Sequence, residues 1–331
     1  MQYTKLGASG LDVSRLCLGT MTFGGQCSEE TSRAIMDTAL EGGIAFFDTA
    51  SSYPHNSTYE NAGGTEEIVG RWLKGKRHRI ILGTKGASRI GPLPWNAGGS
   101  RKHLLDAIDG SLRRLGVDYV DLYQVHHDDV SIPLEETMAA LDAIVTSGKA
   151  RYVGVSNYLA YRLALALGKS EARRLVRPIS VQSRYCLLFR EIERELLPLA
   201  REENVGVTVY NPLAGGMLSG KYRSPSEPPP ENTRFALGGN KANYRERYWH
   251  DRQFETVAAL RELADQAGQT LATLAVAWVL ANPIVTSAIV GASRPEQLAD
   301  SLKAAEFTFD AGMKAQFDEL THEYRFGDSA R

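Results

Sequence analysis

Short apolar segments alternate with longer helical patterns along almost the whole chain, and this rhythm limits the possible folds more than any other feature. The segments rich in Val, Ile, Leu, Phe and Tyr are expected to form β-strands. They lie near residues 15–18, 44–48, 79–84, 119–125, 151–155, 179–182, 205–210 and 286–290. Helical patterns cover 28–42, 64–74, 100–115, 134–147, 158–168, 190–203 and 252–281, and a further helix opens at Pro295. Most successive strands lie roughly 25–40 residues apart, a spacing that suits parallel strands joined by a helix.

These strand–helix units favour a closed barrel over an open doubly wound sheet. Several strands are apolar on both faces, as in the AFF, IIL and VGV runs, which is typical of a covered parallel sheet. Polar residues end nearly every strand, and the active sites of (β/α)8 barrels gather at that end. The first strand also lacks the G-x-G-x-x-G turn of open dinucleotide-binding sheets. We therefore expect one α/β domain over residues 1–331, a (β/α)8 TIM barrel preceded by a β-hairpin that turns at Ser9-Gly10.

Two long loops interrupt the rhythm, and both are expected on the face where the strands end. Residues 86–100 form a loop that contains Trp95, and residues 221–250 form a longer one that includes a run of three prolines. Long loops without secondary structure in compact domains are usually lids or binding loops. For the longer segment, a disordered proline-rich insertion is the alternative.

The composition excludes several classes of partner. The 38 Lys and Arg residues nearly balance the 39 Asp and Glu residues, which argues against nucleic acid or an anionic membrane as the main partner. No apolar run is long enough to span a bilayer, and the start shows no signal-peptide pattern. Cys17, Cys27 and Cys186 are scattered, which is typical of reduced thiols and fits neither a disulfide framework nor a metal site. A cytoplasmic protein is expected.

Four ionisable side chains stand where three consecutive strands are expected to end. Asp48 and Tyr53 follow the IAFF run, Lys85 follows RIILGT, and His126 follows DLYQV. Because the carboxyl ends of parallel strands share one rim, these groups are expected to converge into a site that handles protons. Each residue alone also has a structural interpretation. These are a helix cap for Asp48, a rim aromatic for Tyr53, a lysine with a solvated head for Lys85, and a hydrogen-bonded interior histidine for His126.

Eight motifs in a fixed order resemble one known family. They are LGTMTFG, DTASSY, GTEEIVGRWL, LGTKG, DLYQVHH, YVGVSN, VYNPLAGGMLSGKY and IVGASRPEQL, and together they span nearly the whole chain. In this respect the chain resembles the aldo-keto reductases, and it is similar to the bacterial branch that includes potassium-channel β-subunit-like proteins. The resemblance implies an eight-stranded barrel, a nicotinamide cofactor and the reduction of a carbonyl group.

The resemblance also assigns the four ionisable residues as a catalytic tetrad. A ketone that accepts hydride becomes an alkoxide, so a proton donor is needed at the oxygen. Tyr53 is the donor that the resemblance implies, and the Lys85 ammonium is expected to stabilise its phenolate while Asp48 holds the lysine. His126 is expected to be a neutral donor that orients the carbonyl. Strand alternation would turn His126 and His127 to opposite faces, and His127, Trp95 and Phe23 are candidate substrate contacts.

A larger set of residues resembles the cofactor-binding positions of the family. Tyr210 is expected to stack on the nicotinamide, and Ser156, Asn157 and Gln182 are expected to bind its carboxamide. Ser293 and Arg294 match contacts of the adenosine 2′-phosphate, which favours NADP(H) over NAD(H). The full set is Gly19, Thr20, Met21, Asp48, Ser156, Asn157, Gln182, Tyr210, Asn211, Pro212, Leu213, Ala214, Gly216, Leu218, Gly220, Lys221, Gly291, Ser293, Arg294 and Gln297. One departure is Ser301, preceded by Asp300, where the family commonly has an adenine-binding Asn.

The residues thus predict an oxidoreductase that interconverts a small-molecule carbonyl and its alcohol. Two other functions remain open at this point. An aldolase that forms a Schiff base on Lys85 would explain the lysine but not Tyr53 or the glycine-rich segment after it. A regulatory subunit that binds the cofactor as a sensor would show stable binding with little turnover. The residues favour no particular oligomeric state.

Overall fold

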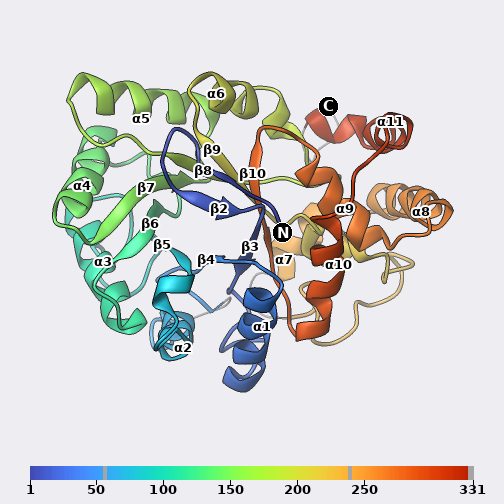
Figure 1. Ribbon diagram of the computed structural model, residues 1–331, viewed down its shortest axis with the longest axis horizontal. Helices are drawn as coiled ribbons and strands as arrows, with labels where there is room; N and C mark the ends of the chain where they lie inside the picture. Colours follow the sequence, from blue (N-terminus) through green and yellow to red (C-terminus); the bar gives the residue numbers. More distant parts are fainter. Residues whose placement is uncertain (55–57, 238–240, 327–331) are drawn as a thin grey trace.

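Eight parallel strands close into a barrel in the computed structural model, which describes residues 1–54, 58–237 and 241–326. In chain order they are β3 (Leu16–Gly19), β4 (Phe46–Asp48), β5 (Ile81–Gly86), β6 (Val120–Val125), β7 (Ala150–Ser156), β8 (Ser180–Arg184), β9 (Gly206–Tyr210) and β10 (Val285–Val290). Each strand pairs with the next, and β10 closes the ring against β3 (Figure 1). The expected (β/α)8 barrel is confirmed.

An outer ring of helices covers the strands. It contains α1 (Glu29–Glu41), α2 (Gly64–Leu73), α3 (Arg101–Leu115), α4 (Leu134–Thr146), α5 (Ala160–Ala172), α6 (Leu196–Glu202), α8 (Asp251–Gln266), α9 (Leu271–Leu280) and α10 (Leu298–Ala304). The expected single helical block over 252–281 is wrong, because it divides into α8 and α9. Gly268 adopts a positive φ of 64° after α8, and the Thr270 hydroxyl accepts the Thr273 N–H to begin α9.

Short 3-10 helices and one terminal helix complete the ring. The 3-10 turns are η1 (Arg77–Arg79), η2 (Glu191–Glu193), η3 (Ala214–Ser219), η4 (Pro295–Gln297) and η5 (His322–Phe326). The expected helix over 190–203 is therefore the turn η2 followed by the shorter α6. Helix α11 (Ala311–Leu320) was not anticipated, although Asp310 caps it by accepting the Met313 N–H.

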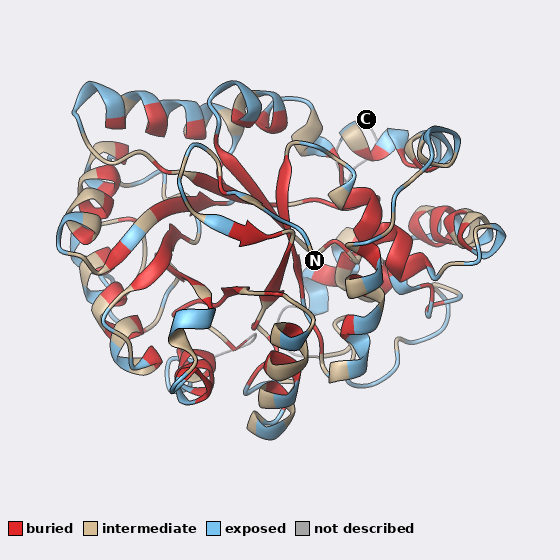
Figure 2. Ribbon diagram, viewed as in Figure 1, coloured by how far each residue is buried: buried red, intermediate tan, exposed pale blue. Residues whose placement is uncertain are grey.

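Apolar side chains pack in two separate layers. The larger layer lies between strands and helices, so the helices are buried on the side that faces the barrel and exposed on the other (Figure 2). The smaller layer fills the inside of the barrel and comprises Leu6, Val13, Cys17, Phe46, Leu122 and Ile289. Residues two positions further along a strand point to the same side. Asp48 after Phe46 and Gln124 after Leu122 therefore stand above this apolar plug, at the carboxyl ends of the strands.

The expected N-terminal hairpin is present, and it closes the other end of the barrel. Strands β1 (Tyr3–Lys5) and β2 (Asp12–Ser14) are antiparallel and lie across the barrel end in Figure 1. Gly7 has φ 59°, and a Cβ there would lie 2.5 Å from the Gly206 nitrogen, so only glycine permits this contact. The Ala8 N–H donates to the Asn204 carbonyl at 2.8 Å. A ligand site is thereby left to the opposite face.

The long segment over 221–250 is a packed lid over that opposite face in its described residues. Its rings form an aromatic cluster in which Trp249 lies 5.2 Å from Tyr222 and 4.9 Å from Phe235, measured between ring centroids. The expectation of a loop without secondary structure is wrong for helix α7 (Lys241–Tyr248), which buries Tyr244 and Tyr248, four residues apart on one face. Residues 238–240 of the segment lie outside the described part.

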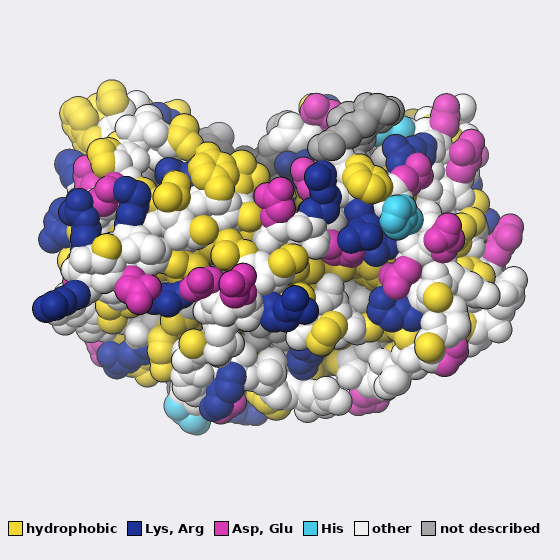
Figure 3. All heavy atoms as spheres, turned by 90° about the horizontal axis from the view of Figure 1, so that it is seen from above, with side chains coloured by type: hydrophobic (Ala, Val, Ile, Leu, Met, Phe, Trp, Pro, Cys, Tyr) yellow, Lys and Arg dark blue, Asp and Glu magenta, His cyan; other side chains and the backbone are white. Residues whose placement is uncertain are grey.

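The molecular surface carries both signs of charge. On the face shown in Figure 3, Lys and Arg side chains are interspersed with Asp and Glu side chains. Among the helices of the described residues, none has both the length and the apolar character that crossing a membrane requires. All three cysteines are buried and form no disulfide.

Candidate active site

A cleft of about 1000 Å³ opens at the carboxyl ends of the strands. Twelve of the residues expected from the sequence line it, and they come from seven strand ends and the loops that follow. They are Gly19, Met21, Asp48, Tyr53, His126, His127, Ser156, Asn157, Gln182, Tyr210, Asn211 and Gly291. Lys85 lies directly behind this lining and is fully buried. Among the described residues, no group of three or more His, Cys, Asp or Glu could hold a metal ion.

Lys85 is the centre of a buried polar network beneath the cleft. Its ammonium forms an ion pair with Asp48 and donates to the Thr49 carbonyl at 2.9 Å. The third contact joins Lys85 Nζ to the Tyr53 hydroxyl at 3.5 Å. The three groups that the sequence placed on neighbouring strand ends therefore do converge.

Asp48 is itself held by two amides. Gln124 and Gln182 each donate from Nε2 to Asp48 Oδ1 at 3.1 Å. Strand register brings them together, because Gln124 pairs with Lys85 across β5 and β6. Gln124 was not anticipated, although its position two residues after the buried Leu122 points it to the same side of the strand. These amides fix the carboxylate that neutralises Lys85.

The electrostatics of the pair favour a protonated phenol beside a charged ammonium. Burial raises the pKa of Tyr53, and the Lys85 charge opposes this rise without cancelling it. Burial alone would lower the pKa of Lys85, but the charge of Asp48, with the hydrogen bonds to Asp48 and Tyr53, outweighs it and raises the pKa above its usual value. The sequence argument included only the effect of the ammonium on Tyr53, and burial is the larger effect. At neutral pH Tyr53 therefore retains its proton.

His126 is positioned as a neutral imidazole. Burial, then the charge of Lys85 and of His127, lowers the pKa of His126 well below its usual 6.5. Its Nδ1 lies 2.9 Å from the Ser88 hydroxyl, and its ring meets that of Tyr53 edge-on at a centroid distance of 5.7 Å. When Ser88 donates to Nδ1, the ring proton is on Nε2, where it can serve as a hydrogen-bond donor. Ser88 belongs to the 86–100 loop and was not anticipated.

The cleft lining includes His127, a candidate substrate contact, but the two histidine rings do not turn to opposite faces. The two rings stack at a centroid distance of 4.4 Å with an interplanar angle of 7°. Strand β6 ends at Val125, so the alternation that governs a strand no longer applies to the next two residues. Burial and the Lys85 charge lower the pKa of His127 as well.

The structure does not bring the other two expected substrate contacts into the cleft. Phe23 is fully buried and packs in the large core cluster between strands and helices. Trp95 lies in the loop after β5, and its side chain is 49% exposed outside the cleft. The cleft is lined instead by Ser88 from that loop and by Arg234, Asn243, Tyr244 and Arg247 from the lid. Their positions depend on how the lid folds back over the barrel.

The side chains expected to meet a nicotinamide form a connected group. Tyr210 donates to Asn157 Oδ1 at 2.8 Å, and Asn157 Nδ2 donates to the His126 carbonyl at 2.9 Å. Asn157 and Asn211 adopt positive φ angles of 60° and 58°, which turn the chain sharply at the ends of β7 and β9. On the opposite wall Gly19 and Gly291 carry no side chain, which leaves room for a planar ring.

Basic groups and a glycine-rich turn occupy the segments in which the phosphate contacts are expected. Gly216 and Gly220 have φ angles of 101° and 71°, which permit the tight turn η3. Partial burial, then the charge of Arg294, lowers the pKa of Lys221, which shows that these two cations lie near each other. Arg234 belongs to the cleft lining and was not anticipated. A Cβ on Gly216 would lie 3.6 Å from Lys221 Nζ, so this ammonium lies beside the glycine turn, an arrangement that fits a phosphate of a dinucleotide.

The remaining expected cofactor residues lie outside the cleft lining. Thr20 is buried and donates to the Asp48 carbonyl at 3.0 Å, while Ser293 N–H and its hydroxyl both donate to Gln297 Oε1. The others outside the lining are Pro212, Leu213, Ala214, Gly216, Leu218, Gly220, Lys221, Arg294 and Gln297. The departure at 300–301 also has a structural account. Asp300 accepts hydrogen bonds from Thr270 and Thr273 and so ties α10 to α9, and Ser301 is buried.

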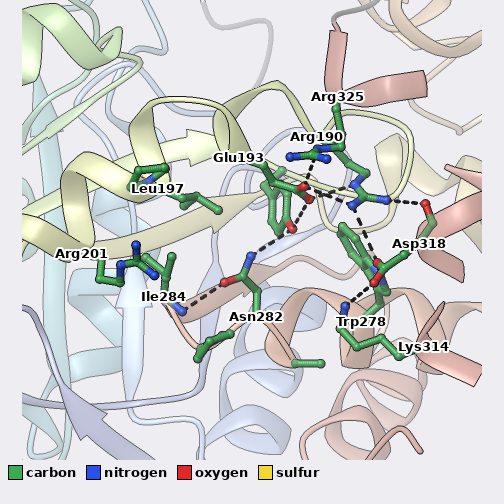
Figure 4. A pocket seen from close by; sticks show the side chains of 14 residues that line it. Arg190, Glu193, Leu197, Arg201, Trp278, Asn282, Ile284, Lys314, Asp318 and Arg325 are labelled. Atoms are coloured by element: carbon green, nitrogen blue, oxygen red, sulfur yellow. Dashed lines mark hydrogen bonds and ion pairs between the residues drawn. The ribbon is translucent and has the colours of Figure 1, made fainter. Parts of the chain in front are cut away.

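A second cavity of about 420 Å³ lies beside α6, α9 and α11 and contains a buried ionic network of its own (Figure 4). Arg190 donates to both carboxylate oxygens of Glu193 and to the Asp318 carbonyl. Glu193 and Asp318 also accept from Tyr185 and Trp278 respectively. Because these partners hold η2, α9 and α11 together, the network has a structural explanation.

Comparison with known proteins gives one consistent result. The model of the Aldo/keto reductase family matches residues 15–322. An uncharacterized oxidoreductase, YrpG of Bacillus subtilis, is 41% identical over 97% of this chain and 96% of the relative. A probable voltage-gated potassium channel subunit beta of Arabidopsis thaliana is 39% identical over 92% of each chain. An L-glyceraldehyde 3-phosphate reductase of Escherichia coli is 36% identical over 96% of this chain and 92% of the relative.

Proposed function

Because the chain belongs to the aldo/keto reductase family, we propose that it is an NADPH-dependent oxidoreductase that reduces an aldehyde or ketone to an alcohol, or catalyses the reverse reaction. One observation carries this proposal. The Tyr53 hydroxyl lies 3.5 Å from a buried ammonium, at the wall of a cleft large enough for a cofactor and a substrate. The proposal includes a single catalytic domain over residues 1–331 and a cytoplasmic location.

The chain's own residues supply the proton and the orientation of the substrate. A bound nicotinamide supplies the hydride, which no side chain can provide. Tyr53 donates a proton to the carbonyl oxygen as negative charge develops there, and burial keeps the phenol protonated until then. Lys85 stabilises the phenolate that remains, and Asp48 holds Lys85 in place. His126 donates a hydrogen bond to the same oxygen as a neutral imidazole.

The preference for NADPH rests on Arg234 in the cleft lining and on Lys221 and Arg294, which lie outside it. Lys221 and Arg294 lie near each other, and Arg234 lines the cleft. The adenosine 2′-phosphate of NADPH adds negative charge that NADH lacks. One of the three cations would therefore have a phosphate partner only when NADPH is bound. Tyr210, Asn157 and Gln182 would hold the nicotinamide end, and Gly19 and Gly291 would leave it space.

A cofactor-oxidation screen tests the proposal directly. NADPH oxidation is followed at 340 nm with a panel of aldehydes, ketones, sugars and steroids, and the screen is repeated with NADH. We expect turnover of at least one carbonyl class and a higher kcat/KM for NADPH than for NADH. Stable NADPH binding without turnover across the panel would contradict the proposed reaction, and an equal kcat/KM for the two cofactors would contradict the preference.

The same structure argues against the aldolase. A Schiff base requires a neutral, accessible amine. Lys85 is fully buried, its ammonium has three partners, and its pKa is raised. Borohydride trapping with carbonyl substrates is therefore expected to leave Lys85 unmodified.

A regulatory role is the second candidate function, because two plant relatives are named as probable potassium channel β subunits. In that case the protein would bind NADPH tightly and turn over slowly while it contacts a partner protein. A measured kcat for good substrates far below the usual enzyme range of about 1–1000 s⁻¹ would favour this role.

A further inference from the structure

A smaller pocket adjoins the catalytic cleft and is not used by the proposed reaction. It has a volume of about 360 Å³ and lies over the ends of β7 and β8. Asn157, Tyr210 and Arg247 line both the cleft and this pocket, so the two spaces share a wall. Arg247 can therefore meet a ligand in either space.

Two guanidinium groups flank the boundary between the two spaces. Arg184, at the end of β8, places its Cζ 3.5 Å from the centroid of the Phe189 ring. Arg247 comes from the last turn of α7 and is half-buried. Burial raises the pKa of Tyr210 while the charges of both arginines oppose the rise, which places both near its hydroxyl. Arg184 and Arg247 therefore both lie near Tyr210, in the wall between the two spaces.

Arg247 offers a positive charge at this boundary. Among the described residues that line the cleft, Asp48 is the one carboxylate, and Lys85 already neutralises it. The pocket also contains Arg194 and the acids Glu191 and Glu195, all three of which are exposed on its rim. Within the described residues, Arg247 has no ion-pair partner. Its guanidinium is therefore available to a ligand.

Helix α7 presents Arg247 from a fixed position. Arg245 Nε donates to the Phe235 carbonyl at 2.9 Å, and Trp249 Nε1 donates to the Pro225 carbonyl at 3.1 Å. Tyr244 packs edge-on against Phe235 at a centroid distance of 6.1 Å. A guanidinium on an anchored helix loses little conformational freedom when it binds an anion, which favours its use in recognition.

We propose that Arg247, in the wall shared by the cleft and the smaller pocket, binds an anionic group of the substrate, so that the preferred carbonyl compounds carry a phosphate or a carboxylate. The apolar remainder of the pocket, which includes Leu159, Phe189 and Ile192, would hold the carbon chain of larger substrates. This inference rests on the proposed carbonyl reductase function and specifies its substrate class.

A binding measurement tests the pocket without requiring turnover. Calorimetric titration of the protein saturated with NADP⁺ compares glycerol 3-phosphate with glycerol, and 4-hydroxybutyrate with 1-butanol. We expect binding of the anionic member of at least one pair to be tenfold or more tighter than that of its neutral partner. A preference in the phosphate pair alone identifies a phosphoryl group, and a preference in both identifies a general anion site.

Turnover of the matched carbonyls, with two variants, assigns the preference to Arg247. The pairs are glyceraldehyde 3-phosphate with glyceraldehyde, and succinic semialdehyde with butanal. Arg247→Gln is expected to lower kcat/KM for the anionic members roughly 10- to 100-fold and to change the neutral members less than about twofold. Lys241→Gln removes a charge from the exposed start of the same helix and should leave all four values unchanged.

The outcomes separate this inference from the function on which it rests. Reduction of neutral and anionic members with equal kcat/KM, or an equal loss for both in Arg247→Gln, would overturn the anion pocket while the reductase stands. A tenfold weaker NADPH dissociation constant in Arg247→Gln, with the anion preference retained, would assign the residue to the cofactor and also overturn it. Anion binding that Arg247→Gln abolishes, with no carbonyl reduced, would support the pocket and refute the reductase.

Discussion

Two buried ionic networks in this molecule use similar groups for different ends. At the mouth of the barrel, Lys85 pairs with Asp48 and both are almost completely buried. Beside α6, α9 and α11, Arg190 is 6% exposed and pairs with Glu193 and Asp318 (Figure 4). Burial and ion pairing alone therefore do not distinguish a catalytic site from a structural one.

The two networks differ in the group that each presents at the wall of its cavity. Every partner of Arg190 is tied to another protein group, since Glu193 accepts from Tyr185 and Asp318 accepts from Trp278. The third contact of Lys85 is with Tyr53, whose hydroxyl carries a proton and which lines the cleft. The Tyr185 hydroxyl donates its proton to Glu193, so the second network only holds elements together. The Tyr53 hydroxyl contacts a cation, so its proton can be donated to a ligand in the cleft.

Removal of the Tyr53 hydroxyl tests this distinction with the largest expected effect. Tyr53→Phe keeps the ring but removes the proton donor, so we expect kcat to fall about 10²- to 10⁴-fold. NADPH affinity, measured by fluorescence titration, should stay within about twofold because the ring is not part of the phosphate groove. Tyr185→Phe is the matched control in the second network, and its kcat should remain that of the wild type. Near-normal kcat in Tyr53→Phe would remove Tyr53 from the reaction.

Removal of the central cation from each network sharpens the comparison. Lys85→Met leaves the buried Asp48 carboxylate without its partner cation, so we expect it to lower the free energy of unfolding by about 3–5 kcal/mol. Arg190→Met leaves Glu193 paired with Arg325 and Asp318 paired with Lys314, so we expect a smaller decrease in the free energy of unfolding. Only Lys85→Met should also lose turnover per folded molecule. Urea unfolding and active-site titration with NADPH measure the two effects separately. A comparable loss of kcat in folded Arg190→Met would break the comparison.

The free energy of unfolding should depend on pH because of buried histidines, two of which lie at the mouth of the barrel. Burial lowers the pKa of His126, His127 and His103, so the folded state binds fewer protons than the unfolded state below pH 6.5. The free energy of unfolding is therefore expected to fall between pH 7 and 5.5, by at most about 1.4 kcal/mol per pH unit for each histidine. The described residues that line the second network include no histidine, so it should not contribute to this pH dependence.

Urea unfolding at several pH values checks this expectation. His127→Gln removes one of the titrating groups and should flatten the slope, whereas Lys314→Gln in the second network should leave the slope unchanged. A free energy of unfolding that rises as the pH falls from 7 to 5.5 would contradict the direction assigned to these histidines.

The smallest expected effect concerns the orientation of His126. Ser88→Ala removes the hydroxyl 2.9 Å from His126 Nδ1, and we expect kcat/KM to fall about tenfold, the equivalent of one hydrogen bond. NADPH affinity should not change. Ser147→Ala, at the end of α4, removes a serine hydrogen bond far from the cleft and serves as the control. An equal loss in both variants would mean that Ser88 supports only the fold.

Much of the fold and the centre of the site could be read from the sequence because both follow from local patterns. Apolar runs of strand length separated by helical patterns specify eight parallel units, and the polar residue that ends a strand must lie on the common rim. Asp48, Lys85 and Gln182 were found in this way. Gln124 could have been found by the same two-residue period, since it follows the buried Leu122.

Only the tertiary structure decided which side chains the lid brings to the cleft and how burial acts on the site. Arg234, Tyr244 and Arg247 belong to a segment whose sequence pattern predicts no strand, so no strand end places them at the rim of the barrel. Their positions depend instead on how Tyr222, Phe235 and Trp249 pack over the barrel. The pKa of Tyr53 likewise depends on desolvation, which exists only once the chain has closed around the phenol. Sequence periodicity fixes which face of an element a residue occupies, but distances and dielectric surroundings arise only when the elements pack.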